Sequence, residues 1–279
     1  MIQMKEFTFQ YESGKKPALK DIDLEIRPGD FVGIIGNSGA GKSTLTYAIN
    51  GIVPHYYPGD FYGSVVVDGM DTVETAPEKL SAKVGSVFQD VDAQMVAANV
   101  EDELLFGMEN FGVPKEEIEA RLQEALFKTG IPELRFREID SLSGGQKQKV
   151  AVAAIIALRP DIIVLDEPTG ELDPESSEQI FRLLRSLNED YGTTIVVVEQ
   201  KVGLLCGYAK RLILLDQGQI AMEGPVREVL KNADRMEEIG IHVPRVVSLY
   251  KELAKKDLFQ GSAPIDLSEA EKMMREVLA

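Results

Sequence analysis

Cysteine is almost absent from this chain of 279 residues, because Cys206 is the only one. An intrachain disulfide is therefore excluded, and a reducing compartment fits the composition. Hydrophobic residues make up 44% of the chain and charged residues 27%, which is an ordinary mixture for a globular protein. A chain of this length can bury a sizeable core without cross-links, and it suits one large domain or one domain with a small extension.

Positive charge and long apolar runs are also scarce. Lysine and arginine number 30 against 46 aspartates and glutamates, which gives a formal net charge of −16. Because nucleic-acid phosphates would be repelled, this balance argues against nucleic acid as a partner. No apolar run reaches the ~20 residues that a membrane-spanning helix needs, and the first residues lack the apolar core of a secretory leader. We therefore expect any membrane role to come through a partner protein.

Short apolar runs alternate with stretches that carry helical periodicity or helix-cap signals. The predicted strands are residues 7–11, 19–26, 31–35, 65–67, 84–88, 161–165, 193–198, 212–215 and 219–222, and the predicted helices are residues 42–50, 115–129 and 174–191. Strands that alternate with helices predict an α/β fold with a mostly parallel sheet. The charged residues beyond about 230 look like an appended helical subdomain.

One segment matches the phosphate-loop pattern G-x-x-x-x-G-K-[ST] and lies between an apolar strand and a helix. Its residues are Gly36, Asn37, Ser38, Gly39, Ala40, Gly41, Lys42, Ser43 and Thr44. Glycines let the backbone wrap so that amide groups point at phosphate oxygens, and the following helix adds its positive N-terminal end. Lys42 can reach the β- and γ-phosphates, and Ser43 can hold magnesium. The alternative is a glycine-rich turn with an exposed lysine.

A second signal is the apolar strand that ends in Asp166 and Glu167. Both carboxylates are expected at the C-terminal edge of the sheet, where ligands bind in such folds. Asp166 can bind magnesium directly or through water, and Glu167 can polarise an attacking water molecule. The alternative is a strand that simply ends in solvated acids.

A third signal is the turn formed by Leu142, Ser143, Gly144, Gly145 and Gln146. A Ser-Gly-Gly turn that opens a helix is a second anion site, built from amides and a hydroxyl group, although it could also be a plain helix cap. One nucleotide does not need two such sites in one chain. Two chains packed head to tail would explain it, because each turn would meet the γ-phosphate held by the other chain.

These motifs occur in the order found in ATP-binding-cassette (ABC) ATPases, and the chain resembles that family over about residues 1–230. The matching segments are the phosphate loop, Gln89, Leu142–Gln146, Leu165–Pro168 and Leu172–Asp173. The resemblance implies ATP and Mg²⁺ as cofactors and a P-loop NTPase core with an antiparallel β subdomain. It also implies a helical subdomain at about 90–155 that carries the signature turn, and a C-terminal helical extension over 231–279.

The resemblance further implies roles for single residues. Gln89 looks like the lid glutamine that contacts magnesium and senses the membrane partner, and Asp173 looks like the acid that touches the opposite chain. Tyr11 looks like the aromatic residue that stacks on adenine, with Phe9 as the other candidate and an exposed strand-edge tyrosine as the alternative. The implied magnesium ligands are Ser43, Gln89 and Asp166.

Three further segments are similar to the energy-coupling-factor (ECF) branch of this family: Asn50–His55, Val87–Gln94 and Leu105–Gly112. In that branch two cassettes, identical or paralogous, drive uptake of a vitamin or metal ion. They sit under a membrane scaffold protein and a separate substrate-binding membrane protein. The resemblance therefore implies a peripheral position on the cytoplasmic face of the cell membrane.

One position departs from the family pattern, because Gln200 stands where most members carry a switch histidine. Glutamine can hydrogen-bond a γ-phosphate or a water molecule, but it cannot become a cation. Two interpretations of this site are therefore open: a slow site, or one half of an asymmetric pair. His55 and His242 lie elsewhere and are expected to be structural or surface residues.

Two alternative functions stay open: a soluble cassette in DNA repair, chromosome maintenance or translation, and a non-hydrolysing regulatory cassette.

Overall fold

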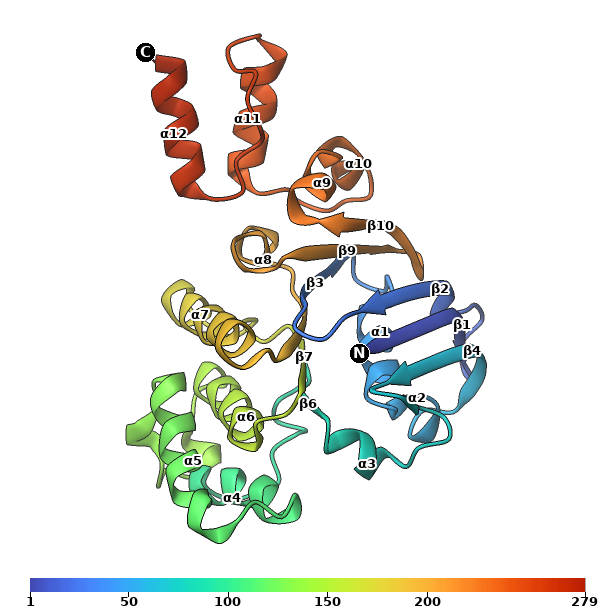
Figure 1. Ribbon diagram of the computed structural model, residues 1–279, viewed down its shortest axis with the longest axis vertical. Helices are drawn as coiled ribbons and strands as arrows, with labels where there is room; N and C mark the ends of the chain where they lie inside the picture. Colours follow the sequence, from blue (N-terminus) through green and yellow to red (C-terminus); the bar gives the residue numbers. More distant parts are fainter. Residues whose placement is uncertain (279) are drawn as a thin grey trace.

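The apolar strands assemble into a six-stranded sheet (Figure 1) in the computed structural model, which describes residues 1–278. In spatial order the strands are β10 (Gln219–Pro225), β9 (Arg211–Asp216), β3 (Phe31–Gly36), β8 (Thr194–Val198), β7 (Ile162–Asp166) and β6 (Val84–Val87). All neighbours pair in parallel except β10, which forms an antiparallel hairpin with β9. The prediction of an α/β fold with a mostly parallel sheet is confirmed, and the C-terminal ends of five strands meet at one edge.

A smaller antiparallel sheet packs beside the central one. Its strands, in spatial order, are β2 (Leu19–Ile26), β1 (Ile2–Tyr11), β4 (Gly59–Val67) and β5 (Met70–Asp71). Strand β1 starts earlier than the predicted residue 7. The prediction missed its first residues because a register shift around Glu6, with φ of 48°, interrupts the alternation of buried residues. Buried residues of both sheets and of helix α1 (Lys42–Ile49) form one hydrophobic cluster. Helix α1 is therefore held firmly where it follows the phosphate loop.

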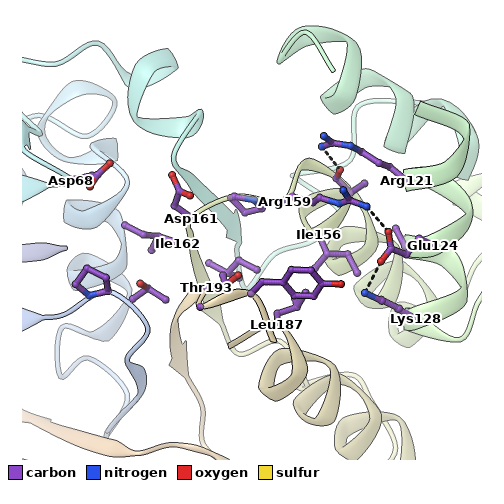
Figure 2. A pocket seen from close by; sticks show the side chains of 18 of the residues that line it. Asp68, Arg121, Glu124, Lys128, Ile156, Arg159, Asp161, Ile162, Leu187 and Thr193 are labelled. Atoms are coloured by element: carbon purple, nitrogen blue, oxygen red, sulfur yellow. Dashed lines mark hydrogen bonds and ion pairs between the residues drawn. The ribbon is translucent and has the colours of Figure 1, made fainter. Parts of the chain in front are cut away.

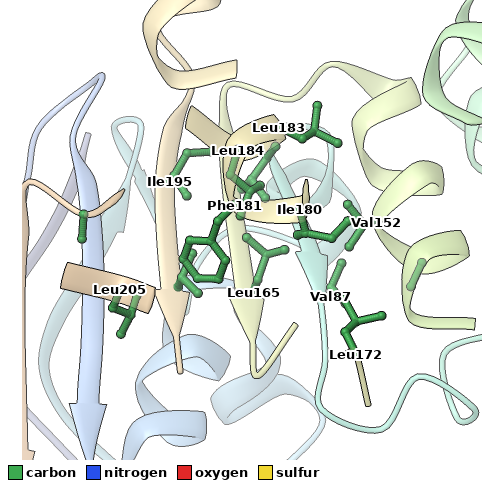
Figure 3. Packing of buried hydrophobic residues seen from close by; sticks show 14 of the residues in the cluster. Val87, Val152, Leu165, Leu172, Ile180, Phe181, Leu183, Leu184, Ile195 and Leu205 are labelled. Carbon is green, nitrogen blue, oxygen red and sulfur yellow. The ribbon is translucent and has the colours of Figure 1, made fainter. Parts of the chain in front are cut away.

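Alternate residues of the central strands face a second hydrophobic cluster under helices α6 (Gly144–Leu158), α7 (Pro174–Tyr191) and α8 (Val202–Tyr208). Figure 3 shows Phe181 of α7 lying against Leu165 and Ile195 of the sheet. The ring of Phe181 also stacks on that of Phe31, with centroids 6.4 Å apart. Strands buried on both faces read as continuous apolar runs, which explains why these segments were recognisable as strands.

Helices α4 (Val100–Asn110) and α5 (Lys115–Thr129) pack with α6 as a group at one end of the molecule (Figure 1). Helix α5 has its predicted limits, since Gly130 adopts the left-handed conformation that ends a helix, with φ of 71°. Helix α7 starts as predicted after Asp173, whose side chain accepts a hydrogen bond from the Ser176 amide over 2.9 Å. Helix α4 had not been predicted.

The last part of the chain is helical, as expected. It contains α9 (Val226–Leu230), α10 (Ala233–Glu238), α11 (Arg245–Lys255) and α12 (Leu267–Leu278), and the last two helices project side by side in Figure 1. The remaining short helices are α2 (Ile52–His55), α3 (Pro77–Ser81), η1 (Pro132–Leu134) and η2 (Ile139–Ser141). Within residues 1–278, no helix combines the length and apolar character that crossing a bilayer requires.

Candidate functional site

The phosphate loop turns sharply between strand β3 and helix α1, and its glycines are required there. Gly39 and Gly41 have φ of 75° and 100°, a region that other residues rarely adopt. A Cβ atom at Gly41 would lie 2.6 Å from the Ala18 carbonyl oxygen, and one at Gly36 would lie 2.5 Å from that of Leu215. Any larger residue at these two positions would displace neighbouring backbone, so this loop shape requires glycine at both.

The side chain of Lys42 folds back over the loop. Its Nζ donates hydrogen bonds to the carbonyl oxygens of Gly36 over 2.9 Å and Asn37 over 3.0 Å. The Ala40 amide also donates to the Asn37 carbonyl oxygen, which closes the turn. The amine is therefore held by neutral carbonyl groups at the start of a helix, and phosphate oxygens would be stronger acceptors for it.

Asp166 lies close enough to Ser43 of the phosphate loop for that hydroxyl to influence its carboxyl group. Asp166 is buried at the end of β7, and burial raises the pKa of its carboxyl group above the ordinary value. The charge of Glu167 adds to this rise, whereas a hydrogen bond from Ser43 and the charge of Lys42 oppose it. A hydroxyl and a carboxylate oxygen side by side are the hard ligands that Mg²⁺ prefers. Within the described chain, no three His, Cys, Asp or Glu residues form a metal site by themselves.

Glu167 lies between two glutamines from distant segments. Nε2 of Gln89 donates to one carboxylate oxygen over 3.1 Å, and Nε2 of Gln200 donates to the other over 2.7 Å. Glu167 has a left-handed backbone with φ of 54°, which is strained for a residue with a long side chain. Its amide donates to the Val198 carbonyl oxygen over 2.9 Å, which holds this conformation.

Lys42, Ser43 and Glu167 line one cavity of about 310 Å³. Besides phosphate-loop residues, the cavity is lined by Ala18, Gln89, Glu167 and Gln200. The structure thus brings together the phosphate loop, Glu167 of the acidic strand end and Gln200 at the switch position, whereas Asp166 is not among the residues that line the cavity. A polar cavity with a lysine, amide donors and a carboxylate is suited to a polyphosphate and an attacking water molecule.

The signature turn lies outside this cavity. Ser143 caps helix α6 in a capping box, in which Gln146 and Ser143 exchange side-chain to backbone hydrogen bonds. A Cβ atom at Gly145 would lie 2.9 Å from the main-chain oxygen of Glu171, and one at Gly144 would lie 3.3 Å from its carboxylate. Asp173 is exposed at the start of α7. The turn and Asp173 therefore lie away from the cavity that holds Lys42.

Tyr11 stands next to the phosphate loop. Its hydroxyl group shares a hydrogen bond with that of Thr44 over 3.0 Å, and burial raises the pKa of the phenol. Its ring makes edge contacts with Phe9 and Tyr57, at centroid distances of 4.9 and 6.2 Å. Phe9 is fully buried, so only Tyr11 of these two candidates has ring surface free for a ligand.

Sequence reasoning missed a buried polar group behind Gln200. Glu199 is buried and accepts hydrogen bonds from the Thr169 hydroxyl over 2.8 Å and from the Gln200 amide over 3.1 Å. Lys201 Nζ donates to the Thr169 and Leu172 carbonyl oxygens and to the Ser177 hydroxyl. The residues on both sides of Gln200 are therefore bonded to the chain between Thr169 and the start of α7. An acid directly after a buried apolar strand was the signal available.

The two histidines do not belong to the site. His55 Nε2 forms a hydrogen bond with the Thr72 carbonyl oxygen over 2.9 Å, and neither histidine lines the cavity described above.

A separate cavity of about 370 Å³ lies between α5, α6 and the start of β7 (Figure 2). Its rim carries the ion pairs of Glu124 with Lys128 and Arg159. None of the predicted site residues lines this second cavity.

Residues 19–170 match the family model described as ABC transporter. A putative ABC transporter ATP-binding protein of Pyrococcus horikoshii is 38% identical over 260 residues, which cover 93% of this chain and 92% of that protein. The energy-coupling factor transporter ATP-binding protein EcfA1 of Clostridium novyi is also 38% identical, over 273 residues that cover 96% of this chain and 95% of EcfA1.

Two solved structures are similar over most of their length. CbiO1 from Clostridium perfringens, part of the ABC transporter complex cbiONQ, has a TM-score of 0.73 at 30% identity, covering 90% of this chain and 98% of that chain. The ATP-binding cassette MJ0796, in a dimeric post-hydrolysis state bound to ADP and Pi, has a TM-score of 0.73 at 31% identity. That similarity covers 81% of this chain and 99% of the cassette.

Proposed function

Because the chain belongs to the ABC transporter ATP-binding family, whose members hydrolyse ATP to power transport, we propose that it is the ATPase subunit of an ECF-type importer of a vitamin or metal ion. The observation that carries the proposal is the convergence of Lys42, Glu167 and Gln200 on one cavity. We assign residues 1–230 to the cassette, with a helical subdomain at about 90–155, and residues 231–279 to a C-terminal helical extension.

We assign ATP binding to the phosphate loop and Tyr11. The loop amides and Lys42 would hold the β- and γ-phosphates, because the positive end of α1 and the amine both face the cavity. Tyr11 would stack on adenine, since its ring lies beside Thr44 and is only half-buried. The contact between Tyr11 and Thr44 would then set the distance between the base and the phosphates.

Ser43, Gln89 and Asp166 are the residues that would hold Mg²⁺. The influence of the Ser43 hydroxyl on the buried Asp166 carboxyl supports this assignment, because it indicates that two hard oxygen ligands lie near each other. When bound, Mg²⁺ would neutralise negative charge that develops on the phosphates. Gln89 also donates to Glu167, so this side chain would connect the ion site with the carboxylate that acts on water.

We assign the hydrolytic step to Glu167 and Gln200. Glu167 would orient the attacking water molecule and polarise its O–H bond, while Gln200 would hold the carboxylate and donate to the γ-phosphate. Glutamine does not titrate, so its contribution would be an amide hydrogen bond at every pH. The buried Glu199 beneath it would fix the backbone from which the amide projects.

A second cassette would complete the site. Ser143, Gly144, Gly145 and Gln146 lie outside the cavity of their own chain, which supports a role on the γ-phosphate bound by a partner. Asp173 would touch that partner, which is an identical chain or a paralogue. Hydrolysis would remove the bridge between the chains, and the pair would open. A membrane scaffold protein near Gln89, with a substrate-binding membrane protein, would use this motion at the cytoplasmic face of the membrane.

Steady-state phosphate release tests the catalytic part of the proposal. Wild-type protein should hydrolyse Mg-ATP, and Glu167→Gln should lower kcat by about 100-fold or more, because it removes the acceptor that polarises water. An activity of the wild type that equals that of Glu167→Gln would instead support the non-hydrolysing regulatory cassette. Gln200 is the observation that favours this second candidate.

Cysteine cross-linking tests the shared site. Cys206 is buried and burial raises the pKa of its thiol to about 12, so engineered cysteines react selectively. In the Glu167→Gln background, Ser38→Cys protein mixed with Ser143→Cys protein should form a disulfide only when Mg-ATP is present. Each single variant alone is the control. Failure of the mixture to cross-link, although ATP binds, would refute a head-to-tail pair of identical chains.

A further inference from the structure

The C-terminal part of the chain reaches the phosphate loop. Nδ2 of Asn37 donates a hydrogen bond to the carbonyl oxygen of Ile239, a residue 202 positions later. Gly240 follows with φ of 90°, and a Cβ atom there would lie 3.0 Å from that same Nδ2. A side chain at residue 240 would therefore strain the backbone and press on the Asn37 amide, which favours glycine where this segment approaches the loop.

Asn37 is bonded on its other side to the phosphate-binding lysine. Its carbonyl oxygen accepts hydrogen bonds from Lys42 Nζ over 3.0 Å and from the Ala40 amide over 3.1 Å. One residue thus contacts the C-terminal segment through its side chain and Lys42 through its main chain. A bound phosphate that attracts Lys42 would therefore act on the main chain of Asn37, the residue whose side chain bonds to Ile239.

The segment is itself fixed to the rest of the protein. Met236 and Ile241 are buried in the cluster beneath the central sheet. Lys251 of α11 forms ion pairs with Asp234 over 2.6 Å and Glu237 over 2.7 Å, which connect α11 to α10. A displacement at Asn37 would therefore be felt by α10 and, through Lys251, by α11.

We propose that Ile239 and Gly240 are positioning residues of the nucleotide site, and that they couple nucleotide binding to the C-terminal helices through Asn37. This inference rests on the proposed binding of nucleotide by the phosphate loop. The bond from Asn37 to Ile239 holds the start of the loop in place while its amides close around the phosphates. Coupling between two sites is reciprocal. If bound nucleotide stabilises the C-terminal segment by a given factor, the ordered segment strengthens nucleotide binding by the same factor.

The first test compares two glycine variants. Gly240→Ala adds a methyl group against Asn37, whereas Gly112→Ala adds one at a similarly left-handed position, φ of 66°, with no atom within 4 Å. Isothermal titration with Mg-ADP should give a Kd about 3- to 10-fold weaker for Gly240→Ala, the value of about one hydrogen bond. Gly112→Ala should bind like wild type, and the KM for ATP of Gly240→Ala should rise more than its kcat falls.

The second test needs no variant at position 240. Hydrogen exchange of the wild-type chain should show lower deuterium uptake in residues 233–243 when Mg-ADP is bound, and Asn37→Ala should lose this protection. Unchanged uptake in a wild type that binds Mg-ADP, or equal affinities for Gly240→Ala and Gly112→Ala, would overturn the coupling alone. A wild type that does not bind Mg-ADP would overturn the proposed function as well.

Discussion

Replacement of Gln200 by alanine measures how the residue at the switch position supports Glu167. Both oxygens of that carboxylate are engaged, by Gln200 over 2.7 Å and by Gln89 over 3.1 Å. A hydrogen bond to a charged group contributes about 1.5–3 kcal/mol. Because Gln200 is exposed, water replaces part of the lost bond, and the lower value of about 1.5 kcal/mol applies. This energy corresponds to about a tenfold loss of kcat.

Phosphate release at saturating Mg-ATP is the assay. Gln200→Ala should show the tenfold loss with little change in KM, and Gln219→Ala, at another exposed glutamine, should match wild type. Gln200→His should recover activity and add a pH dependence at about 6.5, because imidazole titrates there and an amide does not. A wild-type kcat in Gln200→Ala would refute the idea that this residue orients the carboxylate.

Three further predictions concern the signature turn, the buried acid and the core. Gly145→Ala should lower ATPase activity at least about tenfold but leave ATP binding intact, because its Cβ would lie 2.9 Å from the Glu171 main-chain oxygen; weakened binding in a titration would contradict this. Burial raises the pKa of Asp166 in the folded protein, because the ionised carboxylate is unfavourable there. The free energy of unfolding should therefore fall as the pH rises from the ordinary pKa of aspartate through the raised one. Asp166→Asn should therefore raise Tm at pH 7 but not at pH well below the ordinary value, and a lower Tm at pH 7 would refute this. Phe181→Ala should lower the free energy of urea unfolding by about 3–5 kcal/mol, against less than about 0.5 for the exposed Phe127→Ala, and equal losses would contradict the packing.

Local features of the chain were predictable from the sequence because their causes are local. The phosphate loop needs glycines at 39 and 41 whatever surrounds it, since both have a left-handed backbone. Helix α5 ends before Gly130 and α7 starts after Asp173, because a cap acts within one turn of its helix. The mostly parallel sheet was also predictable, since strands buried on both faces are apolar throughout. Strand β1 and helix α4 were less well predicted, because a bulge hides the alternation in β1 and the α4 segment carried no signal that we recognised.

The sequence by itself predicted which residues would carry the chemistry, because the amine, the two acids and the turn of Ser143 stand in recognisable local patterns. Only the tertiary structure decided which of them meet. Glu167 lies between Gln89 and Gln200 because β7 pairs with β6 and β8, and strand order is not written in any local pattern. The contact of Asn37 with Ile239 spans 202 positions and likewise depends on how the C-terminal helices pack. Patterns record interactions over one turn or one strand, whereas contacts between distant segments arise from the burial of all strands and helices together.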